Sequence, residues 1–369
     1  MSSALFSPIK LAGVEFPNRI VVAPMCQYSA DDGCASDWHL THLGMLANSG
    51  AGLVVVEATH VERQGRITHG CLGLYSDANE AALARVLAHC RYIGKAKFAV
   101  QLAHAGRKGS SQRPWEGGKG LKDSDIDQPW QTIAPTPEPY GPEWLPPRQM
   151  EAADFKRVRD AFVDAARRSL RIGFDAIELH MAHGYLLHSF LSPLSNKRND
   201  EYGGDRAGRW RFPLEVTDAV RAVVPKGVPL GARITGSDWS DDGITAEEAA
   251  AFAKELKKHG LDYVDVSSGS ANTLVRNPNT LGYNVPLAEE VKRVSGIPTR
   301  AVGLITSPQQ AEAIVAEGRA DMVALARGFL DNPHWAWHAA RDLGAEVERP
   351  NQYARVSPKT WALPAGATH

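Results

Sequence analysis

The chain is poor in cysteine, and its few cysteines do not cluster. The four, Cys26, Cys34, Cys71 and Cys90, form no C-x-x-C pair, so their spacing argues against a zinc ribbon or an iron–sulfur cluster. No basic segment followed by an apolar run opens the sequence, and no apolar stretch is long enough to span a bilayer. These absences predict a reduced cytoplasmic enzyme without a membrane partner.

An excess of charge of one sign is also missing. Lys and Arg number 41 against 42 Asp and Glu, giving a formal net charge of -1, which is no electrostatic footprint for nucleic acid or an acidic membrane. No G-x-G-x-x-G follows a predicted strand, which argues against a Rossmann domain. Hydrophobic residues at 43% and charged residues at 22% are ordinary for a globular protein.

The chain does contain a regular alternation of short apolar runs and amphipathic segments. About eight such alternations favour a (β/α)₈ TIM barrel over an open doubly wound sheet. Barrels of this kind exceed 250 residues as one unit, so residues 1–369 are predicted to form one domain. The predicted strands are 20–24, 52–58, 98–102, 176–179, 230–234, 263–266, 299–302 and 322–326, and the clearest helical patterns are 81–93, 154–172, 246–259 and 308–316.

Three segments fall outside the alternation. Residues 9–11 and 14–16 flank Ala12-Gly13 and predict an N-terminal β-hairpin that could plug the bottom of the barrel. Residues 105–148, after the third strand, are rich in Pro, Gly and Trp, as binding loops and lids are. Residues 344–369 predict either a disordered tail or an arm that docks elsewhere.

One motif suggests chemistry. His180-Met181-Ala182-His183-Gly184-Tyr185 follows an apolar run, so two imidazoles and a phenol should face the carboxyl end of a strand, where α/β folds keep their active sites. Such donors can hold an oxygen anion and deliver a proton. Two other interpretations stay open: a zinc site shared with Glu178, or two structural histidines with a packed tyrosine.

Taken together, the motifs resemble the old yellow enzyme family, flavin-dependent ene-reductases on a TIM barrel. The resemblance covers nearly the whole chain, and Cys26 with the tail around Tyr353 and Arg355 resembles the thermophilic-like branch that includes xenobiotic reductases. The matching segments are 18–20, 23–26, 101–107, 180–187, 192–204 and 326–327.

The resemblance implies an activity and its cofactors. FMN is bound non-covalently, takes hydride from NADPH (NADH is possible), and passes it to an activated alkene by ping-pong kinetics. The substrates implied are α,β-unsaturated carbonyl and nitro compounds. The same resemblance implies a homo-oligomer, a dimer or a tetramer.

It also implies roles for individual residues. His180 and His183 would grip the substrate oxygen, and Tyr185 would protonate the α-carbon. Cys26 would lie beside the flavin and bond the substrate, although a free cysteine is more often a small buried hydrophobe. Tyr28 would contact the substrate from the opposite wall, or simply pack under the lid.

Further positions would hold FMN. Arg233 would place its cation near the flavin N1–C2=O edge, unless it is only a buried ion pair. Glycine and arginine in the last two strand loops would bind the phosphate. The full predicted set is Pro24, Met25, Cys26, Ala58, Gln101, Arg233, Gly303, Ala326 and Arg327.

Some predictions remain alternatives. Arg355 either reaches into a neighbouring subunit's active site or lies on an exposed tail. His39 and His42, at helical spacing, are interpreted as structural, and His104 as a residue that positions the lid. The rival functions are a metal-dependent TIM-barrel hydrolase built on Glu178, His180 and His183, and a non-catalytic flavin-binding barrel.

Overall fold

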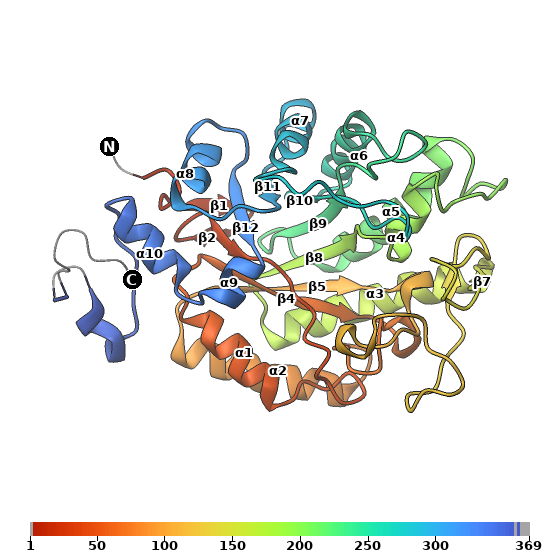
Figure 1. The fold of residues 1–369 in the computed structure, drawn as a ribbon, viewed down its shortest axis with the longest axis horizontal. Coiled ribbons are helices and arrows are strands. Elements are labelled where there is room, and N and C mark those ends of the chain that lie inside the picture. Colours follow the sequence, from red (N-terminus) through yellow and green to blue (C-terminus); the bar gives the residue numbers. More distant parts are fainter. Residues whose placement is uncertain (1–2, 358–359, 362–369) are drawn as a thin grey trace.

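A closed eight-stranded barrel forms the centre of the computed structural model, which describes residues 3–357 and 360–361 (Figure 1). All neighbouring strands that pair in it are parallel. The described strands are β3 (Ile20–Val22), β4 (Leu53–His60), β5 (Lys97–Ala103), β8 (Ala176–Met181), β9 (Leu230–Thr235), β10 (Tyr263–Ser267), β11 (Thr299–Val302) and β12 (Met322–Leu325). The predicted TIM barrel is confirmed.

Helices connect successive strands around the outside. Side-chain caps begin several of them, as where Ser76 accepts from the Asn79 N–H at the start of α2. Gly173, at φ 92°, ends the longest one, α3. The helices are α1 (Asp37–Ala47), α2 (Asp77–Ile93), α3 (Ala152–Ile172), α4 (Leu186–Leu191), α5 (Arg206–Val223), α6 (Ala246–Lys258), α7 (Val285–Ser295), α8 (Pro308–Ala316), α9 (Arg327–Asp331) and α10 (Trp335–Asp342), with short 3₁₀ turns at Arg63–Gly65, Gly106–Lys108, Pro114–Glu116 and Asn351–Val356.

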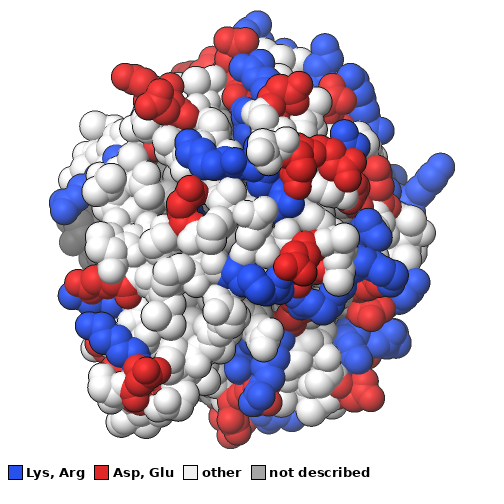
Figure 2. Space-filling model, turned by 90° about the vertical axis from the view of Figure 1, so that its right-hand side faces the viewer, with Lys and Arg blue, Asp and Glu red and all other residues white. Residues whose placement is uncertain are grey.

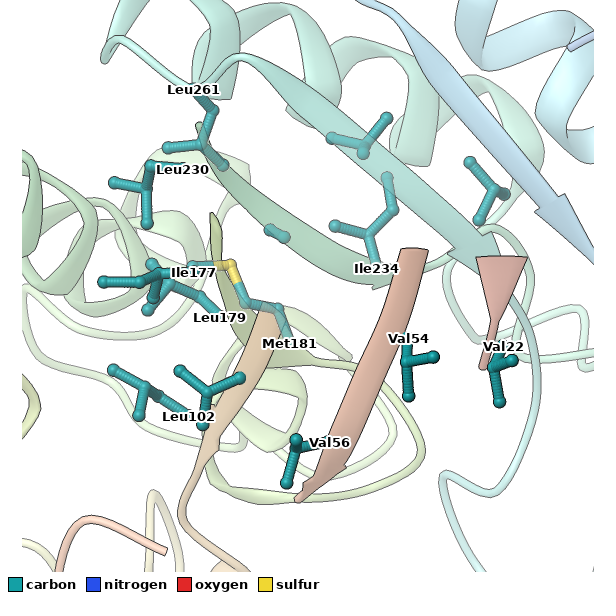
Figure 3. Packing of buried hydrophobic residues seen from close by; sticks show 14 of the residues in the cluster. Val22, Val54, Val56, Leu102, Ile177, Leu179, Met181, Leu230, Ile234 and Leu261 are labelled. Carbon is teal, nitrogen blue, oxygen red and sulfur yellow. The ribbon is translucent and has the colours of Figure 1, made fainter. Parts of the chain in front are cut away.

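Two apolar layers follow from the alternation of side chains along the strands. One set points outward and packs under the helices; Figure 3 shows Val54, Ile177 and Leu179 in this layer. The other set, including Val55 and Tyr263, fills the barrel interior. The candidate functional side chains of the strands also point into the barrel interior.

The N-terminal hairpin closes one end of the interior. Strands β1 (Ile9–Leu11) and β2 (Val14–Phe16) pair antiparallel. Leu11 and Phe16 are buried in the same cluster as the inward residues of the barrel. The predicted plug is therefore confirmed, and it lies at the amino ends of the strands.

The long connection and the C-terminal segment lie at opposite ends of the barrel (Figure 1). The connection contains a two-residue parallel pair, β6 (Ile133–Ala134) and β7 (Arg148–Gln149). Residues 346–350 instead border a hollow beside Asn18, Ala51 and Lys95, which precede β3, β4 and β5. The predicted arm at 344–369 is described only as far as 357 and at 360–361.

Two strand ends differ from prediction. β3 stops at Val22, because Pro24 has no N–H with which to continue the ladder. β8 runs to Met181, so His180 belongs to the strand and does not follow it as predicted. The strand continues because His180 and Met181 pair with Arg233 and Ile234 of β9.

Charged side chains of both signs are interspersed on the face that carries the long connection (Figure 2). This distribution agrees with the balanced composition. Across the described residues, no helix has both the length and the apolar character needed to cross a membrane.

Candidate active site

A cavity of about 410 Å³ opens at the carboxyl ends of the barrel strands. Residues from the loops after β8, β11 and β12 line it, together with inward side chains of β9 and β10. Six of the residues predicted from sequence lie in its wall: His183, Tyr185, Arg233, Gly303, Ala326 and Arg327.

The three groups of the catalytic motif come together. The His180 ring lies edge-on to the His183 ring, with centroids 5.2 Å apart, and to the Tyr185 ring, with centroids 4.9 Å apart. His180 itself is only 4% exposed, behind the other two. His183 Nε2 lies 2.7 Å from Ser267 Oγ of β10.

A tight turn aims these rings. His183 at φ 62° and Gly184 at φ 75° both adopt left-handed backbone, and the Tyr185 N–H donates to Ala182 O at 3.3 Å. Two successive positive φ values are those of a type I′ turn, which here leads from β8 into α4. A Cβ on Gly184 would lie 2.2 Å from Ser270 O, so glycine is required here.

A buried histidine–aspartate pair supports this turn, and the sequence did not reveal it. His188 Nδ1 accepts from the Gly184 N–H at 2.7 Å, and His188 Nε2 lies 3.0 Å from Asp238 Oδ1. Both side chains are fully buried. Asp238 also accepts from Ser192 Oγ and the Ile244 N–H. Because Nδ1 accepts a hydrogen bond, the ring proton of His188 lies on Nε2, facing Asp238. The carboxylate therefore fixes the tautomer and orientation of the ring that holds the Gly184 backbone.

Electrostatics keep the catalytic candidates neutral. Burial, followed by the positive charge of Arg233, lowers the pKa of both His180 and His183 well below its usual value. Burial raises the pKa of Tyr185 well above its usual value. At neutral pH the site therefore presents two uncharged imidazoles and a protonated phenol.

The first strand contributes a wall beside Tyr185. Cys26, Tyr28 and Tyr185 pack against the buried cluster of Ile67, Cys71 and Ala105. Burial and the nearby Glu57 carboxyl raise the pKa of Cys26, so its thiol is protonated at neutral pH. Tyr28 packs edge-on against Trp115 of the long connection, with centroids 5.9 Å apart. Pro24 and Met25 lie just before this wall.

Beneath the cavity, charged side chains form a layer inside the barrel. Arg233 Nε lies 3.1 Å from Asp265 Oδ2, and Arg300 pairs with both Asp265 and Glu178. Gln101 Nε2 donates to Glu178 Oε1 at 2.8 Å, and Ala58 lies beside Gln101 across the strand pair. Arg233 is thus both ion-paired and in the cavity wall.

This layer weakens the metal-site alternative. Arg300 and Gln101 already engage both oxygens of Glu178. Over the described part of the chain, no group of three or more His, Cys, Asp or Glu side chains is arranged to hold a metal ion. A hydrolase built on Glu178, His180 and His183 is therefore not favoured.

The loops after β11 and β12 have room for an anionic group. Gly303 has φ 124°, and a Cβ there would lie 2.8 Å from Asn284 Nδ2. Asn284 is fully buried beside the cavity, and its side-chain nitrogen and oxygen have no partner among the described residues. A buried amide without partners fits a bound polar group such as FMN. Arg327 supplies a cation in the same wall.

One residue of the cavity wall was not predicted from the sequence: Lys108.

Three other residues singled out in the sequence lie outside the cavity. Arg355 lies in the exposed 351–356 turn and not in the cavity of its own chain. His39 pairs with Glu57 at 3.2 Å and His104 with Glu62 at 3.2 Å, as structural histidines do.

The chain is similar to known proteins in both sequence and fold. The NADH:flavin oxidoreductase / NADH oxidase family model matches residues 4–346. NADPH dehydrogenases of Geobacillus thermodenitrificans and Listeria innocua are 44% and 40% identical to this chain, each over 96% of it and 99% of the relative. Morphinone reductase superposes with TM-score 0.76 at 26% identity, covering 96% of this chain and 93% of its own. A 2-naphthoyl-CoA reductase superposes with TM-score 0.83 at 25% identity, over 92% of this chain and 52% of its own.

These likenesses agree with the sequence motifs and with the cavity. The chain is an NADPH-dependent, FMN-binding oxidoreductase, and it belongs to the NADH:flavin oxidoreductase / NADH oxidase family, of the old yellow enzyme type.

Proposed function

We propose that this enzyme is an ene-reductase that reduces the C=C bond of α,β-unsaturated carbonyl and nitro compounds. The observation that carries the proposal is that His183, Tyr185 and Arg233 line one cavity, with the His180 ring packed against the rings of His183 and Tyr185. Reduction of such an alkene requires hydrogen-bond donors for the activating oxygen, which the two neutral imidazoles can supply, and a proton for the α-carbon, which the phenol can supply.

FMN, when bound, supplies the hydride that it has taken from NADPH. Residues around the cavity would hold it. Arg233 would face the electron-rich edge of the ring, with Gln101 and Ala58 beside it and Pro24, Met25 and Cys26 along its other side. Gly303, Ala326 and Arg327 would hold the phosphate.

The histidines would bind the substrate oxygen as neutral donors. His180 Nδ1 accepts from the Ala182 N–H at 3.3 Å, which leaves the ring proton on Nε2. When Ser267 Oγ donates to His183 Nε2, the proton of His183 lies on Nδ1. Each ring then has one N–H to stabilise charge that develops on the oxygen, and one such donor contributes roughly 2.7–4 kcal/mol.

Tyr185 would deliver the proton to the α-carbon. Its raised pKa keeps the phenol protonated at neutral pH, so the group is ready to act as an acid. Cys26 and Tyr28 line the adjoining wall, where they would contact the substrate.

One cavity would serve NADPH and the alkene in turn, which leads to ping-pong kinetics. Relatives 44% and 40% identical are named NADPH dehydrogenases, and a morphinone reductase has been solved with tetrahydroNAD. These names support a nicotinamide donor for this chain.

We also propose that the chain works as one domain in a homo-oligomer, with the arm near Arg355 reaching a neighbouring subunit. The arm lies at the far end of the barrel from its own cavity, which supports action in another copy. The cytoplasm is the proposed compartment, since Cys26, Cys34, Cys71 and Cys90 are all free thiols.

An absorbance spectrum tests the proposal. The visible absorbance of oxidised flavin should bleach with anaerobic NADPH and return on addition of 2-cyclohexenone. Bleaching without return with any enone or nitroalkene would overturn the substrate class. A colourless protein that takes up no FMN would overturn the whole assignment.

A further inference from the structure

Lys108 occupies an unusual position between the lid and the catalytic turn. It ends the 3₁₀ turn Gly106–Lys108 at the start of the long connection. Its Nζ donates to His183 O at 2.7 Å. The same nitrogen lies 4.7 Å from the centre of the Tyr185 ring and 4.6 Å from that of the Tyr140 ring.

These are all the contacts of the Lys108 ammonium within the described residues, and no carboxylate is among them. The charge is balanced only by two aromatic faces and one carbonyl dipole. The positive charge thus acts on three groups at once: the backbone of His183, the phenol of Tyr185 and the lid residue Tyr140.

We propose that Lys108 is a positioning residue for alkene reduction, whose ammonium joins the His183–Tyr185 turn to the lid. This inference rests on the proposed function. The turn is the part that needs such support, because His183 adopts the left-handed backbone that side chains disfavour. With the ammonium in place, the Tyr185 phenol and the His183 ring keep the arrangement in which one donates a proton and the other binds oxygen.

The pKa of Lys108 lies close to neutral pH. Burial, followed by the neighbouring Arg107, lowers its pKa to about 7, and Cys26 opposes this shift. His180, His183, Tyr140 and Tyr185 are the other titratable groups around it. Because the folded pKa lies below the usual 10.5, the ammonium is present below about pH 7 and is lost as the pH rises through that value. The neutral amine attracts neither ring face.

Two substitutions separate charge from shape. In Lys108→Arg the cation persists at every accessible pH, because guanidinium does not titrate in this range. In Lys108→Met the stem remains and the charge is gone. Lys119→Met is the matched control, since Lys119 lies in the same connection but pairs with Glu143 on the surface.

The first measurement is kcat for 2-cyclohexenone between pH 5.5 and 9 with the FMN-loaded enzyme. We expect wild type and Lys119→Met to lose activity as the pH rises through about 7 and Lys108→Arg to keep it to higher pH. Below pH 7, we expect Lys108→Met to be slower than wild type by at least about ten-fold, with a difference that shrinks as the wild-type amine loses its proton. FMN content should be equal in all four. An identical alkaline limb in Lys108→Arg, or an unchanged kcat in Lys108→Met, would overturn the inference.

The second measurement does not depend on the substrate class. Hydrogen–deuterium exchange of peptides covering 182–186 reports the turn directly, since the Tyr185 and Gly184 amides are bonded within it. Exchange there should be several-fold faster in Lys108→Met than in Lys108→Arg or Lys119→Met. Equal exchange would sink the inference even if the enzyme reduces enones. Faster exchange in an enzyme that reduces no alkene would sink the proposed function alone.

Discussion

A buried imidazole that stays neutral can bind the substrate oxygen beside Arg233 without the charge repulsion that a protonated imidazole would suffer. His180 and His183 sit near Arg233, and burial with that cation keeps the pKa of both low. A protonated pair would repel Arg233 and each other inside a site of low polarity. The same Arg233 that suits an electron-rich cofactor edge therefore also fixes the protonation state of the oxygen-binding residues.

Neutral histidines give a clear pH expectation. A free imidazole would gain a proton near pH 6.5, but the lowered pKa of this pair moves that event to lower pH. We expect kcat/KM for an enone to stay level from pH 7 down to about 5.5. An acid limb near 6.5 that disappears in His183→Asn would contradict this expectation.

Removing the Tyr185 hydroxyl should separate the two half-reactions. In Tyr185→Phe the ring still packs against His180 and Lys108, but it has no proton to give. We expect enone reduction to slow by about 10²–10⁴-fold, while anaerobic reduction of FMN by NADPH keeps its rate. Stopped-flow absorbance measures both steps. Equal slowing of both would show that the phenol has a packing role.

The element that matters most is the turn that follows β8. His188 of α4 holds it from below, and Lys108 holds it from the lid side. Its two left-handed residues would be unfavourable in isolation. Hydrogen bonds from two separate segments therefore help to determine where the catalytic rings lie.

The His188–Asp238 pair should carry much of that support. His188→Leu leaves the Asp238 carboxylate buried without the imidazole that hydrogen-bonds to it, and an unpaired buried charge typically destabilises a protein by about 3–5 kcal/mol. A lower thermal midpoint and a lower kcat should appear together. Adding Asp238→Asn should restore part of the stability, because the unpaired charge is removed.

A surface pair provides the control for this experiment. His259 and Asp218 form an exposed pair at 2.6 Å. Since such pairs contribute about 0–1 kcal/mol, His259→Leu should leave the thermal midpoint nearly unchanged. An equal loss in both variants would show that the buried pair has no special role.

The sequence predicted the barrel well, because each parallel strand is a short apolar run between helical patterns. It also predicted that His183, Tyr185 and Arg233 lie near one another at the working face of the barrel, and all three line the cavity; their roles in the reaction stay predictions. It could not predict Lys108, since a lysine after Arg107 in a loop resembles any surface lysine. His188 and Asp238 lie 50 positions apart in the sequence, and Asn284 lies in no motif, so only the folded chain shows their contacts.

At the scale of the whole molecule, the two ends of the barrel differ. The hairpin closes the amino end of the strands with Leu11 and Phe16, and the 105–148 connection covers the carboxyl end, where the cavity opens. The C-terminal arm leaves from the plugged end. A single copy therefore cannot use Arg355 in its own cavity in the conformation described.

The arm yields a prediction about assembly. If Arg355 acts in a neighbouring copy, Arg355→Ala should raise KM for the alkene several-fold, with FMN content and thermal midpoint unchanged. Steady-state kinetics and the flavin-to-protein absorbance ratio measure these quantities. Loss of FMN would instead point to a folding role, and no change in KM would leave the arm outside the reaction.

The register between β8 and β9 sets His180 opposite Arg233. A shift by one residue would turn one of these side chains out of the barrel while the other stayed inside. Inserting or deleting a single residue in either strand should therefore abolish the chemistry outright. The part of the connection that follows Lys108 is under no such constraint of strand register, so exchanging residues 109–148 between homologous enzymes is a route by which new substrate preferences could be obtained without rebuilding the reaction.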